Sequence, residues 1–140
     1  MKIKKDLWAR VRRLIRNWAV PVGRGLFFLF ILRFVFFVGY VPSVSMEPAI
    51  KEGSFIFGIR VFGEPERGDV VVFERNNMLM VKRVAGIPGD VVCAAGGALT
   101  VPDGSYFVLG DNPEDSYDSR YWDEPFVPGS SIIAKLWPPR

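Results

Sequence analysis

The sequence predicts a mainly β protein, with a compact antiparallel β domain preceded by one N-terminal transmembrane helix. Two patterns support this fold class. Basic residues crowd the first 16 positions, and a strongly apolar stretch follows them. Beyond Pro48, short apolar segments of strand length alternate with turn residues, without a long amphipathic helix pattern. With 140 residues, the chain has room for one small domain and one membrane segment.

Charge is distributed unevenly along the chain. Residues 1–33 contain nine Lys or Arg and the single acid Asp6, whereas residues 34–140 contain nine basic and fourteen acidic residues. Basic residues just before an apolar segment keep that end on the cytoplasmic side of a membrane. We therefore expect residues 1–16 to be a basic cytoplasmic tail, and we expect no nucleic-acid binding by the folded domain. A cleaved secretory signal is the alternative, but Arg33 and bulky Phe residues stand where a cleavage site of small residues is expected.

The apolar stretch allows two placements of the membrane helix, because Arg24 and Arg33 interrupt it. In the first, the helix spans residues 17–32 and Arg33 lies at the level of the outer headgroups. In the second, it spans residues 26–41 and Arg33 lies near the middle of the membrane, where a charge is costly. We expect the first placement, which leaves residues 33–140 as an extracytoplasmic β-rich domain.

Short strands separated by turns are predicted for the rest of the chain. We expect strands at residues 34–41, 54–61, 69–74, 78–84, 90–94 and 106–109. The pairs Asn76-Asn77 and Gly96-Gly97 are among the turn signals between them. The single cysteine, Cys93, cannot form an intrachain disulfide.

Ser45 and Lys82 are the candidate catalytic pair. Ser45 lies shortly after the apolar stretch, and Lys82 follows 37 positions later. The chain has no histidine, so the imidazole base of a Ser-His-Asp triad is excluded and lysine is the remaining candidate. A lysine base must be neutral, and burial lowers its pKa from the usual value of about 10.4. Strand alternation places Lys82 between Met80 and Val84 on one face, although an arbitrary strand lysine is normally exposed.

Four blocks of sequence, in order, resemble bacterial type I signal peptidases, which are membrane-anchored Ser-Lys enzymes that remove signal peptides. The blocks are 42–48 (PSVSMEP), 68–73 (GDVVVF), 82–90 (KRVAGIPGD), and 110–112 (GDN) continuing to 116–120 (SYDSR). Each block alone is a weak signal, but four in the same order are specific. The resemblance covers residues 17–138.

The resemblance implies a role for each candidate site residue. Ser45 would be the nucleophile and Lys82 the general base, within hydrogen-bonding reach of each other. The hydroxyl of Ser43 would join the backbone amide of Ser45 in an oxyanion hole, with a simple turn hydroxyl as the alternative role. Ser116 would orient the amine of Lys82.

Charged residues of the last block are expected to be structural. Asp118 and Arg120, together with Arg83, would form ion pairs that hold the last loop against the strand of Lys82. The acids of this loop fit no regular calcium site, and the resemblance implies neither a metal nor a cofactor. We interpret the segment 110–112 as a turn that braces the site.

The implied function is that of a signal peptidase I, a serine endopeptidase that cleaves N-terminal signal peptides from exported preproteins. It would be a single-pass protein of the cytoplasmic (inner) membrane, with its N-terminus in the cytoplasm and its catalytic domain on the outer side. Its partners would be signal-peptide-bearing preproteins and the lipid bilayer. Only 27 residues separate Lys82 from Gly110, where larger members insert an extra β region, so a minimal domain is expected.

Three alternatives remain open at this point. A dedicated peptidase for pilin or conjugation proteins would share the motifs and the fold. A self-cleaving repressor would share the Ser-Lys chemistry, but the membrane segment and the absence of a helical DNA-binding pattern count against it. A non-catalytic, membrane-anchored β module that binds peptides would not need both the nucleophile and the base.

Overall fold

The computed structural model describes residues 2–94 and 96–137, without the side chains of residues 2–11 and 14. The chain divides into two units, Met1–Phe34 and Val35–Arg140. Helix α1 (Lys2–Val35) accounts for the first, and all the described strands belong to the second.

Within α1, the segment Ile15–Val35 is long and apolar enough to cross a membrane, judged by length and composition. Its 21 residues have a helical length of about 32 Å, which matches the hydrocarbon core of a bilayer at about 30 Å. The large apolar side chains of this segment are exposed. A lipid environment would cover this apolar surface at no cost in backbone hydrogen bonds, because the helix satisfies its own.

The helix continues further than the sequence pattern indicated. Phe34 and Val35, which we expected in the first strand, are helical, and strand β1 begins at Phe36. A helix that continues to residue 41 is therefore incompatible with the structure. The limits of the bilayer along α1, including the expected span of residues 17–32, stay a prediction.

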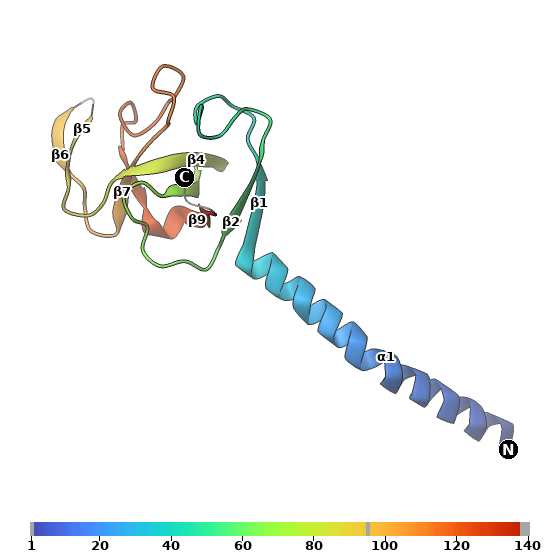
Figure 1. The fold of residues 1–140 in the computed structure, drawn as a ribbon. Coiled ribbons are helices and arrows are strands. Elements are labelled where there is room, and N and C mark those ends of the chain that lie inside the picture. Colours follow the sequence, from blue (N-terminus) through green and yellow to red (C-terminus); the bar gives the residue numbers. More distant parts are fainter. Residues whose placement is uncertain (1, 95, 138–140) are drawn as a thin grey trace. The chain divides into compact units, whose positions relative to one another are not determined.

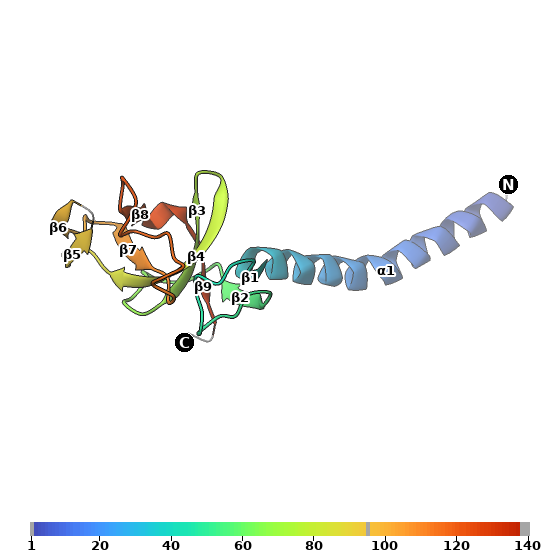
Figure 2. The ribbon, with the colours of Figure 1, turned by 90° about the horizontal axis from the view of Figure 1, so that it is seen from above.

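A seven-stranded antiparallel sheet forms the centre of the second unit, in the order β1-β2-β9-β3-β4-β7-β8 (Figures 1 and 2). Its strands are β1 (Phe36–Tyr40), β2 (Phe55–Ile59), β3 (Val70–Arg75), β4 (Met78–Gly86), β7 (Ser105–Leu109), β8 (Phe126–Pro128) and β9 (Ile132–Leu136). A separate hairpin of β5 (Val91–Ala94) and β6 (Gly97–Thr100) lies at the end of the domain away from β1 and β2 (Figure 1). A single 3₁₀ turn, η1 (Gly129–Ser131), precedes β9. The predicted fold class, a mainly β antiparallel domain after an apolar N-terminal helix, is confirmed.

Three strands were missed by the sequence prediction. Strand β6 begins at Gly97, which we had assigned to a turn. Strand β8 is only three residues long and ends in Pro128, and proline is tolerated there because β8 is the edge of the sheet. Strand β9 was missed because every position except Lys135 is apolar, so the sequence does not show the alternation of a strand. It lies between β2 and β3, near the middle of the sheet.

Strand β3 is buried on both faces. Val70 and Val72 pack in one apolar cluster, while Val71 and Phe73 pack in a second cluster. Successive side chains of a strand point to opposite faces, so β3 contributes to two cores at once. This explains its continuous apolar run, which is typical of a strand covered on both sides.

A two-residue turn joins β3 to β4. Asn76 and Asn77 have φ angles of 53° and 61°, and Arg75 pairs directly with Met78 across the hairpin. Positive φ at both central positions is characteristic of a type I′ turn, and asparagine tolerates this conformation better than most residues. The turn fixes the register that places Val71 opposite Lys82.

Candidate active site

The segment carrying Ser45 folds into tight turns shortly after β1. The backbone N–H of Glu47 donates to the Val44 carbonyl at 3.0 Å, and the N–H of Ile50 donates to the Met46 carbonyl at 2.8 Å. Met46 is completely buried, and Ser45 is 8% exposed. The turns therefore anchor Ser45 to the core through its neighbour while leaving it a small opening to the surface.

Lys82 lies on β4 and is 3% exposed, so an exposed strand position is excluded. Burial lowers the pKa of its amine below the usual value for lysine. The carboxylate of Asp118 opposes this shift, and the guanidinium of Arg120 adds to it. The amine therefore loses its proton at a lower pH than an exposed lysine does.

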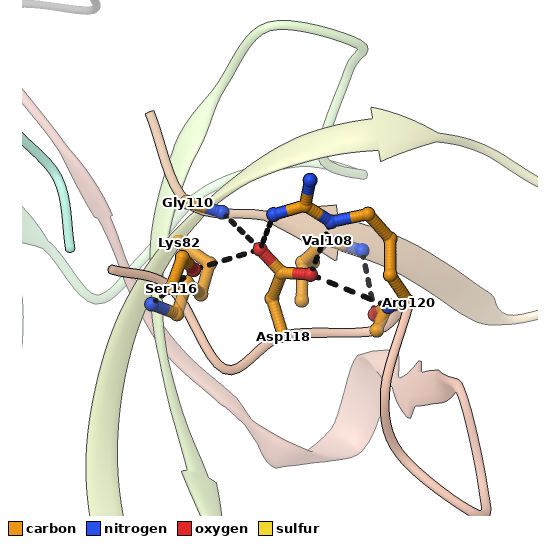
Figure 3. A network of polar contacts seen from close by, with 7 residues as sticks. Lys82, Val108, Gly110, Ser116, Asp118 and Arg120 are labelled. Atoms are coloured by element: carbon orange, nitrogen blue, oxygen red, sulfur yellow. Dashed lines mark hydrogen bonds and ion pairs between the residues drawn. The ribbon is translucent and has the colours of Figure 1, made fainter. Parts of the chain in front are cut away.

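Ser116 connects the amine of Lys82 to a buried carboxylate (Figure 3). The Nζ atom of Lys82 donates to Ser116 Oγ at 3.0 Å, and the Ser116 hydroxyl donates to Asp118 Oδ2 at 2.7 Å. A carboxylate only accepts hydrogen bonds, so the Ser116 proton points to Asp118 and its oxygen accepts from Lys82. Ser116 thereby fixes the direction in which the amine points.

Asp118 is completely buried and has several donors (Figure 3). Arg120 Nε donates to Oδ1 and Arg120 Nη2 to Oδ2, both at 2.8 Å, and the N–H of Gly110 donates to Oδ2 at 2.9 Å. Burial raises the pKa of the Asp118 carboxyl, but the hydrogen bonds from Arg120, Gly110 and Ser116 together lower it below its usual value. The carboxylate therefore stays ionised and keeps its place as the acceptor of Ser116.

Arg83 forms a second ion pair next to the base. Its Nε and Nη2 atoms donate to the two carboxylate oxygens of Asp111 at 2.7 and 2.6 Å, and its Nη1 atom donates to the Gly68 carbonyl at 2.8 Å. The sequence interpretation grouped Arg83 with Asp118 and Arg120, whereas the structure pairs Arg83 with Asp111. Strand alternation is the reason, because neighbouring side chains on β4 point to opposite faces.

The sequence interpretation described the segment 110–112 only as a turn that braces the site. The structure shows which residues of the nucleophile segment it contacts. The backbone N–H of Asn112 donates to the Ser45 carbonyl at 3.1 Å, and its side-chain amide donates to the Val44 carbonyl at 3.3 Å. A Cβ atom at Gly110 would collide with Ser116 Oγ and lie 2.5 Å from the Ser45 carbonyl oxygen. A side chain is therefore excluded at Gly110, because the segments of Ser116 and Ser45 approach it closely. In the sequence, the Gly-Asp-Asn run marks this close contact.

A cavity of about 410 Å³ contains both members of the candidate pair in its wall. Ser43 and Ser45 line it with their hydroxyl oxygens 3.3 Å apart, and Lys82 lines it as well. No hydrogen bond joins Ser45 to Lys82, both of which the structure describes, so the expected direct contact is not formed. Catalytic hydrogen bonds are often longer without substrate. The other lining residues are mostly apolar; β1, the segment that follows it and residues 79–81 of β4 contribute most of them, and β2, β3 and the loop after β7 add the rest.

Within the described residues, no group of three or more His, Cys, Asp or Glu side chains could hold a metal ion. Asp111 and Asp118, the most buried acids of the last loop, each pair with an arginine.

Comparison with known proteins identifies relatives over most of the chain. The model of the family described as "Signal peptidase, peptidase S26" matches residues 15–101 and 97–137. The chain is 32% identical to a probable signal peptidase I-2 of Synechocystis sp., over 71% of this chain and 62% of that protein. It is 30% identical to a signal peptidase I of Pseudomonas fluorescens, over 74% of this chain and 61% of that protein, and 29% identical to signal peptidase I S of Bacillus subtilis, over 78% and 80%. The chain thus spans a little over three fifths of the length of the first two relatives.

Proposed function

This chain belongs to the signal peptidase family, peptidase S26, and we propose that it is a membrane-bound serine endopeptidase that cleaves N-terminal signal peptides from exported preproteins. Ser45 is the proposed nucleophile and Lys82 the proposed general base. One observation carries the proposal: the buried amine of Lys82, oriented by Ser116, lines the same cavity as Ser45. Burying a lysine amine costs folding free energy whatever its role, and such a costly position next to a cavity favours a functional reason for it.

Acylation is the first proposed step. The neutral amine of Lys82 takes the proton of the Ser45 hydroxyl while the oxygen attacks the scissile carbonyl carbon. The negative charge that develops on the carbonyl oxygen is accepted by the backbone N–H of Ser45 and by the hydroxyl of Ser43. Lys82 then gives its proton to the leaving nitrogen, so the C–N bond breaks and the mature protein leaves with a free amine.

Hydrolysis of the acyl-enzyme completes the cycle. The neutral amine of Lys82 takes a proton from water, the hydroxide oxygen attacks the ester carbon, and the proton returns to Ser45 as the ester bond breaks. The signal peptide leaves with a new carboxylate. Asp118 keeps Ser116 oriented through both steps and exchanges no proton itself.

The proposed substrate follows from the cavity and the helix. The apolar wall, to which β1 and residues 79–81 contribute, suits apolar side chains before the scissile bond, and the family resemblance implies small ones. The apolar segment of α1 suits a single membrane crossing, with the basic tail of residues 1–16 in the cytoplasm and the domain of residues 33–140 on the outer side of the cytoplasmic membrane. Preproteins held in the bilayer by their signal peptides are therefore the proposed partners.

Cleavage of a fluorescently labelled preprotein by the full chain in lipid vesicles tests the proposal. We expect the wild type to release the mature protein and both Ser45→Ala and Lys82→Met to reduce cleavage to background. Lys51→Met, which changes an exposed lysine, is the matched control and should cleave normally. Wild-type cleavage by Lys82→Met would overturn the assignment of the base.

Labelling by a serine-directed acylating inhibitor separates an enzyme from a peptide-binding module. We expect the wild type to be labelled and Ser45→Ala to remain unlabelled. An unreactive wild type that still binds signal peptides would support the binding module instead. Pilin-like substrates tested beside a general preprotein distinguish a dedicated peptidase from a general one.

A further inference from the structure

The cavity that holds Ser45 and Lys82 has one acidic side chain in its described lining, that of Asp115. Asp115 is exposed, and it comes from the loop between β7 and β8, whereas most of the apolar wall comes from β1, the segment after it and β4. The proposed mechanism does not use this carboxylate. Its position nevertheless puts a negative charge beside any peptide that occupies the cavity.

A hydrogen-bonded bridge ties Asp115 to the nucleophile segment. The side-chain amide of Asn112 donates to Asp115 Oδ2 at 3.3 Å and also to the Val44 carbonyl at 3.3 Å. The carboxylate is therefore two hydrogen bonds away from the residue that precedes Ser45. This bridge restrains a side chain that would otherwise move freely in solvent.

Asp115 also lies where the cavity meets a second, open depression. Asp115 and Tyr117 line both, and the depression adds Glu114 and Tyr121 but no residue of β1 or β4. The rings of Tyr117 and Tyr121 are stacked, with centroids 6.3 Å apart and an angle of 13° between their planes. A peptide that leaves the apolar cavity on this side passes an acidic and aromatic surface.

If the proposed function holds, the direction in which the peptide chain runs through the cavity can be inferred. The segment before the scissile bond is the apolar end of a signal peptide, which suits the wall of β1 and β4. We therefore place the first residues of the mature protein toward Asp115, where the cavity and the depression share lining residues.

We propose that Asp115 is a specificity-determining residue that selects substrates by the charge of the residues immediately after the scissile bond. A basic residue there is attracted to the carboxylate, and an acidic residue is repelled. Apart from Lys82, no basic side chain lies in the described lining of the cavity. We expect each unit of substrate charge to change kcat/KM by about 3- to 10-fold, the range of a partly screened contact.

Three peptides that differ only at the first position after the scissile bond test this inference. With Lys, Gln or Glu at that position, the wild type should rank them in that order by kcat/KM. Asp115→Asn keeps a carbonyl that can accept from Asn112, so the bridge survives, and the three values should converge to within about 2-fold. Asp103→Asn, which removes an exposed acid outside the cavity lining, is the control of equal charge and should keep the wild-type order. The role of Asp115 would be overturned if Asp115→Asn kept the wild-type ranking of the three peptides by kcat/KM. It would also be overturned if Asp103→Asn lost that ranking to the same extent.

Binding to the Ser45→Ala variant separates this inference from the proposed function. We expect Ser45→Ala to bind the Lys peptide more tightly than the Glu peptide, and Ser45→Ala/Asp115→Asn to bind both equally. If the wild type cleaves nothing while Ser45→Ala keeps this preference, the proposed function fails and the charge selection stands. If the wild type cleaves all three peptides equally, the charge selection fails and the proposed function stands.

Discussion

Ser116 donates its hydroxyl proton to the buried carboxylate of Asp118 at 2.7 Å, so its oxygen is left to accept from Lys82. We predict that Ser116→Ala lowers kcat by about 10- to 100-fold and changes KM less than about 2-fold, because the base loses orientation but the cavity keeps its shape. Steady-state kinetics with a signal-peptide substrate measures this split. Ser119→Ala is the control, since Ser119 is also buried but its Oγ accepts from the Val108 N–H. An equal loss of kcat in both variants would contradict the orienting role.

The pH dependence of the reaction should report the lowered pKa of Lys82. Burial, the largest cause of the shift, disfavours the protonated amine. Only the neutral amine accepts the Ser45 proton, so kcat/KM should rise with pH and level off below the usual lysine pKa of about 10.4. Rates in a series of buffers at constant ionic strength test this. A rate that is still rising steeply at that pH would mean that Lys82 is charged in the working enzyme.

Stability should also depend on pH through Lys82. Its pKa is lowered in the folded state, so between that pKa and the unfolded value the unfolded chain binds more protons. Unfolding free energy therefore rises with pH in this window. Lys82→Met removes this titration, so we expect it to stabilise the domain most below the folded pKa of Lys82 and to give a flatter profile between the folded and unfolded pKa values. Thermal unfolding of the wild type and Lys82→Met across pH measures the difference, and parallel profiles would contradict the lowered pKa.

Gly110→Ala should damage the site more than the fold of the remaining sheet. The added Cβ meets Ser116 Oγ and the Ser45 carbonyl, so Ser116 and the nucleophile segment are pushed apart. We predict at least a 100-fold loss of activity and a destabilisation of about 1 to 3 kcal/mol, typical of overpacking. Gly63→Ala is the matched control, because nothing lies within 4 Å of the added atom. Activity assays and denaturant unfolding of both variants give the comparison, and wild-type activity in Gly110→Ala would refute the close packing.

Local pattern predicted much of this molecule. Strand alternation placed Lys82 between Met80 and Val84 on one face and left its burial open, and the structure leaves only 3% of that residue exposed. The Asn76-Asn77 pair indicated a turn, which the structure places between β3 and β4. Strand alternation and turn preferences depend on residues that are neighbours in the sequence. Both can therefore be predicted from the sequence alone.

The missed features depend on residues far apart in the chain. Strand β9 pairs with both β2 and β3, and nothing within its five residues signals that central place. Asp111, which pairs with Arg83, lies 28 positions away, and three other acids (Glu114, Asp115 and Asp118) follow it within seven positions. The contacts of Asn112 with Val44 and Ser45 join segments more than 60 positions apart. Such pairings are set by the closing of the fold and not by local propensity.

The turn at Asn76-Asn77 has a consequence for chemistry that happens six residues away. Because neighbouring positions on β4 face opposite sides of the sheet, slipping the β3–β4 pairing by one residue would turn Lys82 to the other face. Either Val81 or Arg83 would then stand opposite Val71, and neither an alkyl side chain nor a guanidinium, which keeps its proton, can serve as the base. The hairpin turn therefore sets which side chain of β4 faces the cavity, and we expect one residue inserted in it, if the pairing slips, to abolish the proposed activity without changing any residue of the site.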